Sequence, residues 1–249
     1  MELVRNCSHG SDIVTYFEKR GKQIKVIKTS LTKEGRENLK KEIEGRLWYS
    51  RQLNHENKSV PATVVIDSAH YMRIEYDYLQ GVKADCRKGL VPNAGILEKL
   101  VGHYASIWPY NNGESTTLHG DLSIDNVIEG DGCIRIIDWE HFRESSTFWG
   151  YDALYAIFET LWFGMRERAK PQSREIKIIK KLISILNSTS FLQRDNKDKP
   201  LMSVIGYLQN NKAMWGEQLE KCPNKLPVLL YSKEQVSLID HMISEKDSD

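Results

Sequence analysis

Long apolar runs are missing from this chain of 249 residues, and cysteine is scarce. No stretch approaches the roughly 18 consecutive apolar residues of a membrane-spanning helix, and the opening MELVRNCSHGSD lacks the apolar core of a secretory signal. The four cysteines contain no Cys-x-x-Cys pair, and in such a chain reduced thiols are expected: Cys7, Cys86, Cys133 and Cys222. These absences predict a cytoplasmic protein with no transmembrane segment.

An excess of charge of one sign is also absent. The formal net charge is +1, with 35 Lys and Arg against 34 Asp and Glu. Nucleic-acid-binding proteins usually carry a strongly basic face, so this balance argues against a nucleic-acid partner. Hydrophobic residues make up 40% and charged residues 28%. That composition is typical of a folded globular protein, and the length suits one large domain or two lobes that share a cleft.

The first eighty residues have the pattern of a small sheet with one inserted helix. Residues 12–28 form two apolar runs around a glycine, which predicts a β-hairpin. The segment KEGRENLKKEIEGRLWYSRQL spaces Leu39, Ile43 and Leu47 four residues apart, which predicts one stripe of an amphipathic helix. Two more strand-like runs flank the sequence DSAH. Residues 1–80 are therefore expected to form a β-rich N-terminal lobe, with a connector at residues 77–81.

Helices dominate the sequence from residue 92 onward. The segment NAGILEKLVGHYASIW predicts one helix, and four more are expected at residues 149–168, 174–187, 201–219 and 232–244. The final SEKDSD is expected to be a solvated tail. Residues 81–249 are thus expected to form a larger, mostly helical C-terminal lobe, which gives an α+β fold class.

A polar segment with a strand-like core interrupts these helices. Residues 127–137, VIEGDGCIRII, hold two apolar runs around the tight-turn sequence GDG. The residues that enter and leave such a hairpin lie about 5 Å apart between Cα atoms, so Asn126 and Asp138 are expected side by side. Their oxygens suit Mg²⁺, which takes phosphates and water as further ligands. Asp121, on the preceding loop, is placed to accept a hydroxyl proton.

This segment resembles the catalytic segment of the protein-kinase-like superfamily. There, His-x-Asp is followed by four residues and an Asn, and a hairpin then leads to a second Asp. Here the pattern stands as HGD at 119–121, Asn126, and DWE at 138–140. The glycine and the Trp-Glu pair resemble the aminoglycoside phosphotransferase and choline kinase family. The resemblance implies a protein-kinase-like fold and ATP- and Mg²⁺-dependent phosphoryl transfer, with Asp121 as catalytic base and Asn126 and Asp138 as metal ligands.

The resemblance also predicts a strand lysine paired with a helix glutamate. Lys28 ends the run IKVIK, and Val26 shares its face by the strand period and would line the adenine pocket. Lys25 is the reserve candidate. Glu42 and Glu44 lie on opposite sides of the helix stripe, and periodicity does not choose between them. The family favours Glu42, because it commonly has a basic residue and Glu six residues before a Trp.

Two further nucleotide-binding segments are implied by the resemblance. YMRIEYDYLQG resembles the hinge, where the backbone around Asp77 and Leu79 would contact the adenine edge; an ordinary strand end fits this pattern equally well. Gly10 and Ser11 stand where the phosphate-covering loop should lie. That loop is the poorest match, since it lacks Gly-x-Gly-x-x-Gly.

Two residues are expected to support the catalytic loop without reacting. His119 is interpreted as a structural histidine, and Asp152, which opens a helix as in the family, is expected to hold the loop by hydrogen bonds. The aromatic residues of 148–164 could form a cage for a cation such as choline. Aromatic residues at helical spacing more often belong to the core, and that interpretation is favoured.

The sequence leaves the acceptor open. Residues 166–181 carry seven Lys and Arg against two Glu, which favours a neutral or anionic sugar-type small molecule or glycan over a polycationic aminoglycoside. An exposed helix face would explain the same charges. Glu140 keeps a choline- or ethanolamine-type acceptor open. The alternative class is a pseudokinase that only binds nucleotide or a partner, and a protein kinase is disfavoured because no Ala-Pro-Glu follows Asp138. The oligomeric state and the choice of ATP or GTP stay open.

Overall fold

The computed structural model describes residues 13–53, 62–109, 116–145, 149–188 and 231–245. Gly10 and Ser11, the helix expected at 201–219 and the C-terminal tail from 246 lie outside these ranges. Within the described ranges, no helix combines the length and apolarity needed to cross a bilayer. Of the cysteines placed here, Cys86 and Cys133 carry free thiols.

Four antiparallel strands form the sheet at one end of the molecule, in the order β1-β2-β4-β3. The strands are β1 (Ile13–Arg20), β2 (Gln23–Ser30), β3 (Thr63–Asp67) and β4 (Met72–Asp77). Gly21 makes the turn between β1 and β2 with φ +64°, a left-handed conformation that glycine adopts without strain. The predicted hairpin and the two later strands are confirmed.

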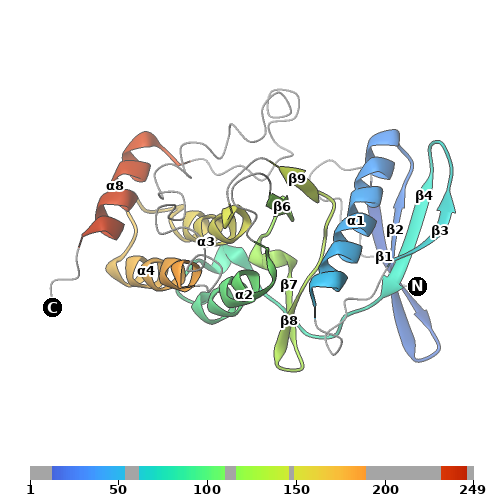
Figure 1. Ribbon diagram of the computed structural model, residues 1–249, viewed down its shortest axis with the longest axis horizontal. Coiled ribbons are helices and arrows are strands. Elements are labelled where there is room, and N and C mark those ends of the chain that lie inside the picture. Colours follow the sequence, from blue (N-terminus) through green and yellow to red (C-terminus); the bar gives the residue numbers. More distant parts are fainter. Residues whose placement is uncertain (1–12, 54–61, 110–115, 146–148, 189–230, 246–249) are drawn as a thin grey trace.

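Helix α1 (Lys33–Gln52) packs between this sheet and the rest of the chain (Figure 1). It begins where the Thr32 side chain accepts a hydrogen bond from the Gly35 amide at 3.1 Å. The predicted stripe is wrong at its C-terminal end, because Leu47 is 40% exposed. The buried face instead follows a spacing of three and four residues through polar positions: Leu39, Glu42, Gly45, Arg46 and Tyr49.

The remaining chain is mostly helical, with short strands at its centre (Figure 1). Its helices are α2 (Ala94–Ile107), α3 (Tyr151–Gly164), α4 (Ser173–Asn187) and α8 (Lys233–Ser244). One small sheet joins β5 (Val82–Lys83), β7 (Val127–Gly130) and β8 (Cys133–Ile136), and another joins β6 (Thr116–Leu118) and β9 (Arg143–Ser145). The predicted hairpin and four of the predicted helices are confirmed, although α3 is shorter than expected.

The larger hydrophobic core lies among these helices. Helix α3 is buried almost all round, and its aromatic residues belong to this core, as favoured from the sequence: Trp149, Tyr151, Tyr155 and Phe158. A smaller core cluster lies between the four-stranded sheet and α1. The molecule is therefore an α+β protein with a small antiparallel β lobe carrying one helix and a larger helical lobe. The division expected at residues 80 and 81 stays a prediction.

Candidate active site

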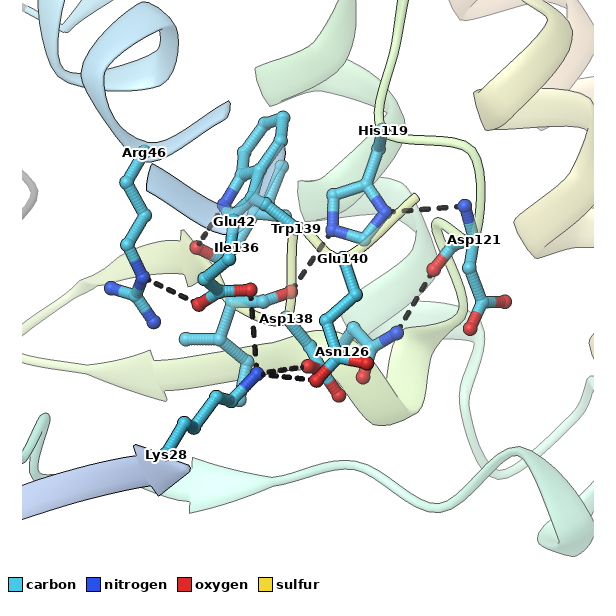
Figure 2. A network of polar contacts seen from close by, with 11 residues as sticks. Lys28, Glu42, Arg46, His119, Asp121, Asn126, Ile136, Asp138, Trp139 and Glu140 are labelled. Atoms are coloured by element: carbon cyan, nitrogen blue, oxygen red, sulfur yellow. Dashed lines mark hydrogen bonds and ion pairs between the residues drawn. The ribbon is translucent and has the colours of Figure 1, made fainter. Parts of the chain in front are cut away.

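The β7–β8 hairpin brings the expected metal ligands to one end. Val127 pairs with Ile136, and the Ile137 amide donates to the Asn126 carbonyl at 2.9 Å. Asn126 therefore lies opposite Ile137, one residue before the expected partner Asp138. Asp138 has φ +68°, a left-handed conformation that is uncommon outside glycine and that ends the strand. Figure 2 shows the side chains of Asn126 and Asp138 directed to the same region, at the end of the Lys28 side chain.

Lys28, on β2, is buried among three carboxylates (Figure 2). Its Nζ lies 2.5 Å from Asp138 Oδ1, 2.9 Å from Glu140 Oε1 and 3.3 Å from Glu42 Oε2. The structure thus joins the strand lysine to the helix glutamate and to the end of the hairpin. The two alternatives left open by the sequence lie elsewhere. Glu44 is exposed, and the reserve candidate, Lys25, pairs with Asp77 at 2.6 Å.

Arg46 is a member of this network that sequence reasoning missed. Its Nε donates to Glu42 Oε1 at 2.6 Å, and its guanidinium lies 3.6 Å from the centre of the Tyr76 ring. Arg46 is only 1% exposed, so an arginine is buried together with its carboxylate partner. The signal was present in the sequence, since Glu42 and Arg46 have the four-residue spacing of a helical ion pair.

The network has an excess of negative charge. Lys28 and Arg46 supply two positive charges, and the three carboxylates supply up to three negative ones. Burial acts to raise the pKa of Asp138, but the Lys28 ammonium outweighs it and holds that pKa well below its usual range. Burial raises the pKa of Glu140 to about 7, with the Asp138 carboxylate acting in the same direction and Lys28 against it. Asp138 is therefore ionised at neutral pH, and an added cation would balance the remaining charge.

His119 holds the loop before the hairpin, as expected. Its Nε2 donates to the Ile137 carbonyl at 2.9 Å, because a carbonyl oxygen can only accept. Its Nδ1 therefore accepts from the Asp121 amide at 3.3 Å. Burial lowers the pKa of His119 to about 4, so the ring is neutral at physiological pH. Both ring nitrogens are occupied by the backbone, which makes His119 a structural residue.

Asp152, at the start of α3, fixes the same loop from the other side. Its carboxylate accepts from the His119 amide at 2.7 Å and the Gly120 amide at 3.1 Å. Gly120 has φ +86°, and a Cβ there would lie 2.4 Å from the His141 carbonyl oxygen. Only glycine fits this turn, which explains the glycine between the histidine and Asp121.

Asp121 lies beside the hairpin end. Its carbonyl accepts from Asn126 Nδ2 at 2.9 Å, which fixes the Asn126 amide and turns its oxygen away from this bond. Burial raises the pKa of Asp121 to about 7, with the Asp138 charge adding to the shift and a hydrogen bond from Tyr155 opposing it. A carboxylate that titrates near neutral pH suits proton transfer in either direction.

Behind Asp121, sequence reasoning missed a second carboxylate on α3. The Tyr155 hydroxyl donates to Glu159 Oε1 at 3.0 Å. Burial raises the pKa of Glu159 to about 8, and the Asp121 charge contributes. Asp152, Tyr155 and Glu159 follow the spacing i, i+3, i+7, so helical periodicity from Asp152 could have placed them on one face.

These buried carboxyls predict a fall in stability between about pH 6.5 and 8. Burial raises the pKa of Asp152 to about 7 and that of Glu159 to about 8. Stability from such groups is present below their unfolded pKa and is lost as the pH rises through the folded value. Burial also lowers the pKa of His103, His119 and His141 to about 4, and these act oppositely, but only below pH 6.5.

The measurement is the free energy of unfolding in denaturant at pH 6.5 and pH 8. We expect a loss of about 2 kcal/mol at the higher pH. Glu159→Gln is the matched variant, because it removes the group with the highest raised pKa and should flatten the profile. A wild-type stability that stays level or rises across this interval would contradict the assignment.

The expected adenine-side residues lie next to Lys28 on the sheet. In the β2–β4 register Val26 faces Tyr76 and Lys28 faces Ile74, so Val26 and Lys28 share one face. Val26 is buried in the smaller core cluster. Beyond β4, the Tyr78 amide donates to the Ile24 carbonyl at 2.9 Å, so that amide is occupied. Asp77 and Leu79, on either side of it, follow directly from the end of β4.

Comparison with known proteins gives the fold. No protein-family model matches the chain, and no curated protein sequence does. Among solved structures, the amicoumacin kinase hAmiN in complex with AMP-PNP, Ca²⁺ and Ami is similar over 97% of this chain and 86% of that chain. The TM-score is 0.56 at 9% sequence identity. The chain has a kinase-like fold. At this identity the likeness extends to the fold alone, which confirms the fold class expected from the sequence.

The kinase-like fold accounts for the way distant segments meet. Lys28 and Asp138 are separated by 110 residues, and Lys28 and Glu140 by 112, yet their charged atoms are in direct contact. The four-stranded sheet supplies the lysine, α1 supplies Glu42, and the hairpin of the helical lobe supplies the carboxylates (Figure 2). The candidate site therefore lies where the small lobe meets the large one.

Proposed function

We propose that this chain is an ATP- and Mg²⁺-dependent phosphotransferase that acts on a hydroxyl group of a small molecule. The observation that carries the proposal is the Lys28 ammonium in contact with both Glu42 and Asp138, at the end of the hairpin that also carries Asn126. The amicoumacin kinase of similar fold was solved with AMP-PNP and Ca²⁺, a nucleotide and a divalent cation. That finding supports the proposal without testing it for this chain.

Asn126 and Asp138 would hold the magnesium ion. The donor set fits, because an amide oxygen and an ionised carboxylate are the hard oxygen ligands that Mg²⁺ takes together with phosphates. The charge fits as well, since the network around Lys28 has an excess of negative charge. When bound, the ion neutralises charge on the phosphate groups of the nucleotide.

The other residues bind and orient the reactants. Lys28, held by Glu42, contacts the phosphates, and Asp121 orients the acceptor hydroxyl and takes its proton late in the transfer. Phosphoryl transfer depends mainly on positioning and electrostatic stabilisation, so these few side chains suffice. His119 and Asp152 hold the loop that carries Asp121.

The nucleotide would lie between the lobes. Val26 would line the adenine pocket, the backbone at Asp77 and Leu79 would contact the adenine edge, and Gly10 and Ser11 would cover the phosphates. The lobes would divide at residues 80 and 81.

A neutral or anionic sugar-type acceptor, free or in a glycan, is the acceptor we propose. Glu140, which kept a choline- or ethanolamine-type acceptor open, is buried and contacts Lys28 at 2.9 Å, so it gives no support for a cationic one. The basic stretch at 166–181 gives weaker support than its composition indicated. Arg168 is bound to Glu175 and to the Gly164 carbonyl, and Lys181 is paired with Glu98.

A coupled ADP-release screen tests the function. The acceptors are sugars, aminoglycosides and amino alcohols, and the Asp138→Ala protein is the blank. ADP release that needs Mg²⁺ and rises only with an added acceptor supports the phosphotransferase and names its acceptor class. Tight ATP binding without turnover across the whole panel would contradict it and would support a pseudokinase that only binds nucleotide or a partner.

A further inference from the structure

Helix α1 approaches the loop after β8 most closely at Gly45. A Cβ at this position would lie 2.7 Å from Trp139 Cβ, 2.8 Å from Trp139 Cε3 and 3.0 Å from Phe142 Cβ. These distances are shorter than ordinary packing contacts allow, and two of the three atoms are Cβ atoms fixed to the backbone. Any side chain at residue 45 would therefore push α1 away from the loop that carries Trp139.

Glycine has a cost at this place. In a helix interior it is about 1 kcal/mol less favourable than alanine. Two glycines on α2, Gly95 and Gly102, have no other atom within 4 Å of the point that a Cβ would occupy, so a side chain would fit there. Gly45 differs from both, because at this position the missing side chain is what lets two segments touch.

Trp139 is enclosed and cannot yield to a larger neighbour. It is fully buried, and its Nε1 donates to the Ile136 carbonyl at 3.2 Å. Aromatic rings surround it, with centroid distances of 4.5 Å to His119, 5.1 Å to Tyr49, and 6.0 Å to Trp48, Trp108 and Phe142. A side chain at residue 45 would therefore move the helix, because the loop is held on its other sides.

The contact lies between two segments that both reach Lys28. Glu42 is three residues before Gly45 on the same buried face of α1, and Asp138 directly precedes Trp139. Lys28 Nζ spans the two, at 3.3 Å from Glu42 Oε2 and 2.5 Å from Asp138 Oδ1 (Figure 2). The bond to Glu42 is already the longer one, so a small outward shift of α1 would break it first.

We propose that Gly45 is a positioning residue, whose missing side chain seats α1 on Trp139 and so sets the distance between Glu42 and Lys28. The inference rests on the proposed function, because the consequence of that distance is the placement of Lys28 on the nucleotide phosphates. Gly45 touches no reactant and acts through Glu42.

The test compares Gly45→Ala with Gly102→Ala, the matched change at an open helix position. Dissociation constants for ATP with Mg²⁺ are measured by calorimetry, well below the unfolding temperature of each protein. Gly102→Ala should leave the constant within about twofold of the wild type, while Gly45→Ala should weaken binding about tenfold in a folded protein. Folded Gly45→Ala protein with wild-type affinity and turnover would overturn the inference.

A double-mutant cycle separates positioning from a merely structural role. If Gly45 acts through Glu42, then Gly45→Ala should add little to the loss of affinity caused by Glu42→Gln alone. Fully additive losses would overturn the inference. Should Gly45→Ala not fold, the same cycle is run with Trp139→Leu, which removes the ring against α1, and the same two outcomes decide. Wild-type protein that binds no ATP with Mg²⁺ would overturn the proposed function as well, whereas normal wild-type binding with an unaffected Gly45→Ala protein would overturn the inference alone.

Discussion

Asp121→Asn is expected to lower kcat about a thousandfold and to leave the affinity for ATP with Mg²⁺ within about twofold of the wild type. The substitution removes the carboxylate that would take the acceptor proton and keeps its size. The backbone bond that the Asp121 carbonyl accepts from Asn126 is unaffected. Nucleotide and metal binding should therefore survive the loss of the chemical step.

Stability separates this loss from misfolding. Burial and the neighbouring Asp138 charge raise the pKa of Asp121 to about 7, so its ionised form is disfavoured in the fold. A neutral amide should thus fold at least as well above pH 7. Asp125→Asn is the matched control: its carboxylate, on the same loop, accepts from the Cys86 amide at 2.6 Å, and an asparagine oxygen can accept the same bond. Turnover of Asp121→Asn at the level of Asp125→Asn would remove Asp121 from the mechanism.

Asp138→Asn is expected to reduce kcat/KM at least a thousandfold and to abolish the effect of Mg²⁺ on ATP affinity. The change removes the only ionised carboxylate of the two proposed metal ligands and the closest partner of Lys28. Lys28 keeps Glu42 and Glu140 as partners, so the fold should persist. The measurements are steady-state kinetics over a range of Mg²⁺ concentrations and a denaturant titration.

Asp131→Asn is the control for this prediction. Asp131 lies at the exposed tip of the same hairpin with φ +51°, a conformation that asparagine tolerates equally well. It should have wild-type kinetics. Wild-type, Mg²⁺-dependent turnover in the Asp138→Asn protein would show that the metal is held elsewhere.

Helix α1 shows where sequence periodicity succeeds and where it fails. Its existence and bounds followed from the spacing of Leu39 and its successors, because helices bury one face. The choice of face was wrong from Leu47 onward, since periodicity assigns charged residues to solvent. In this helix Glu42 and Arg46 are buried as a pair, and Leu47 is exposed in their place. A buried ion pair inverts the signal on which the method depends.

The candidate site was predictable in part for a related reason. Local geometry brought Asn126 and Asp138 to one hairpin end, and the one-residue offset arose because the left-handed backbone of Asp138 ends the strand early. The contacts of Lys28 with Asp138 and Glu140 depend on how the lobes pack, which no local pattern contains. Gly45 was invisible for the same reason, because its partner Trp139 is distant in the sequence.

Binding of Mn²⁺ as a paramagnetic substitute for Mg²⁺ tests the central claim most directly. Free Mn²⁺ is measured by electron paramagnetic resonance as the protein is added with and without ATP, for the wild type, Asp138→Asn and Asp131→Asn. The account predicts that wild type and Asp131→Asn take up Mn²⁺ in the presence of ATP and that Asp138→Asn does not. Equal Mn²⁺ uptake by all three proteins would contradict it.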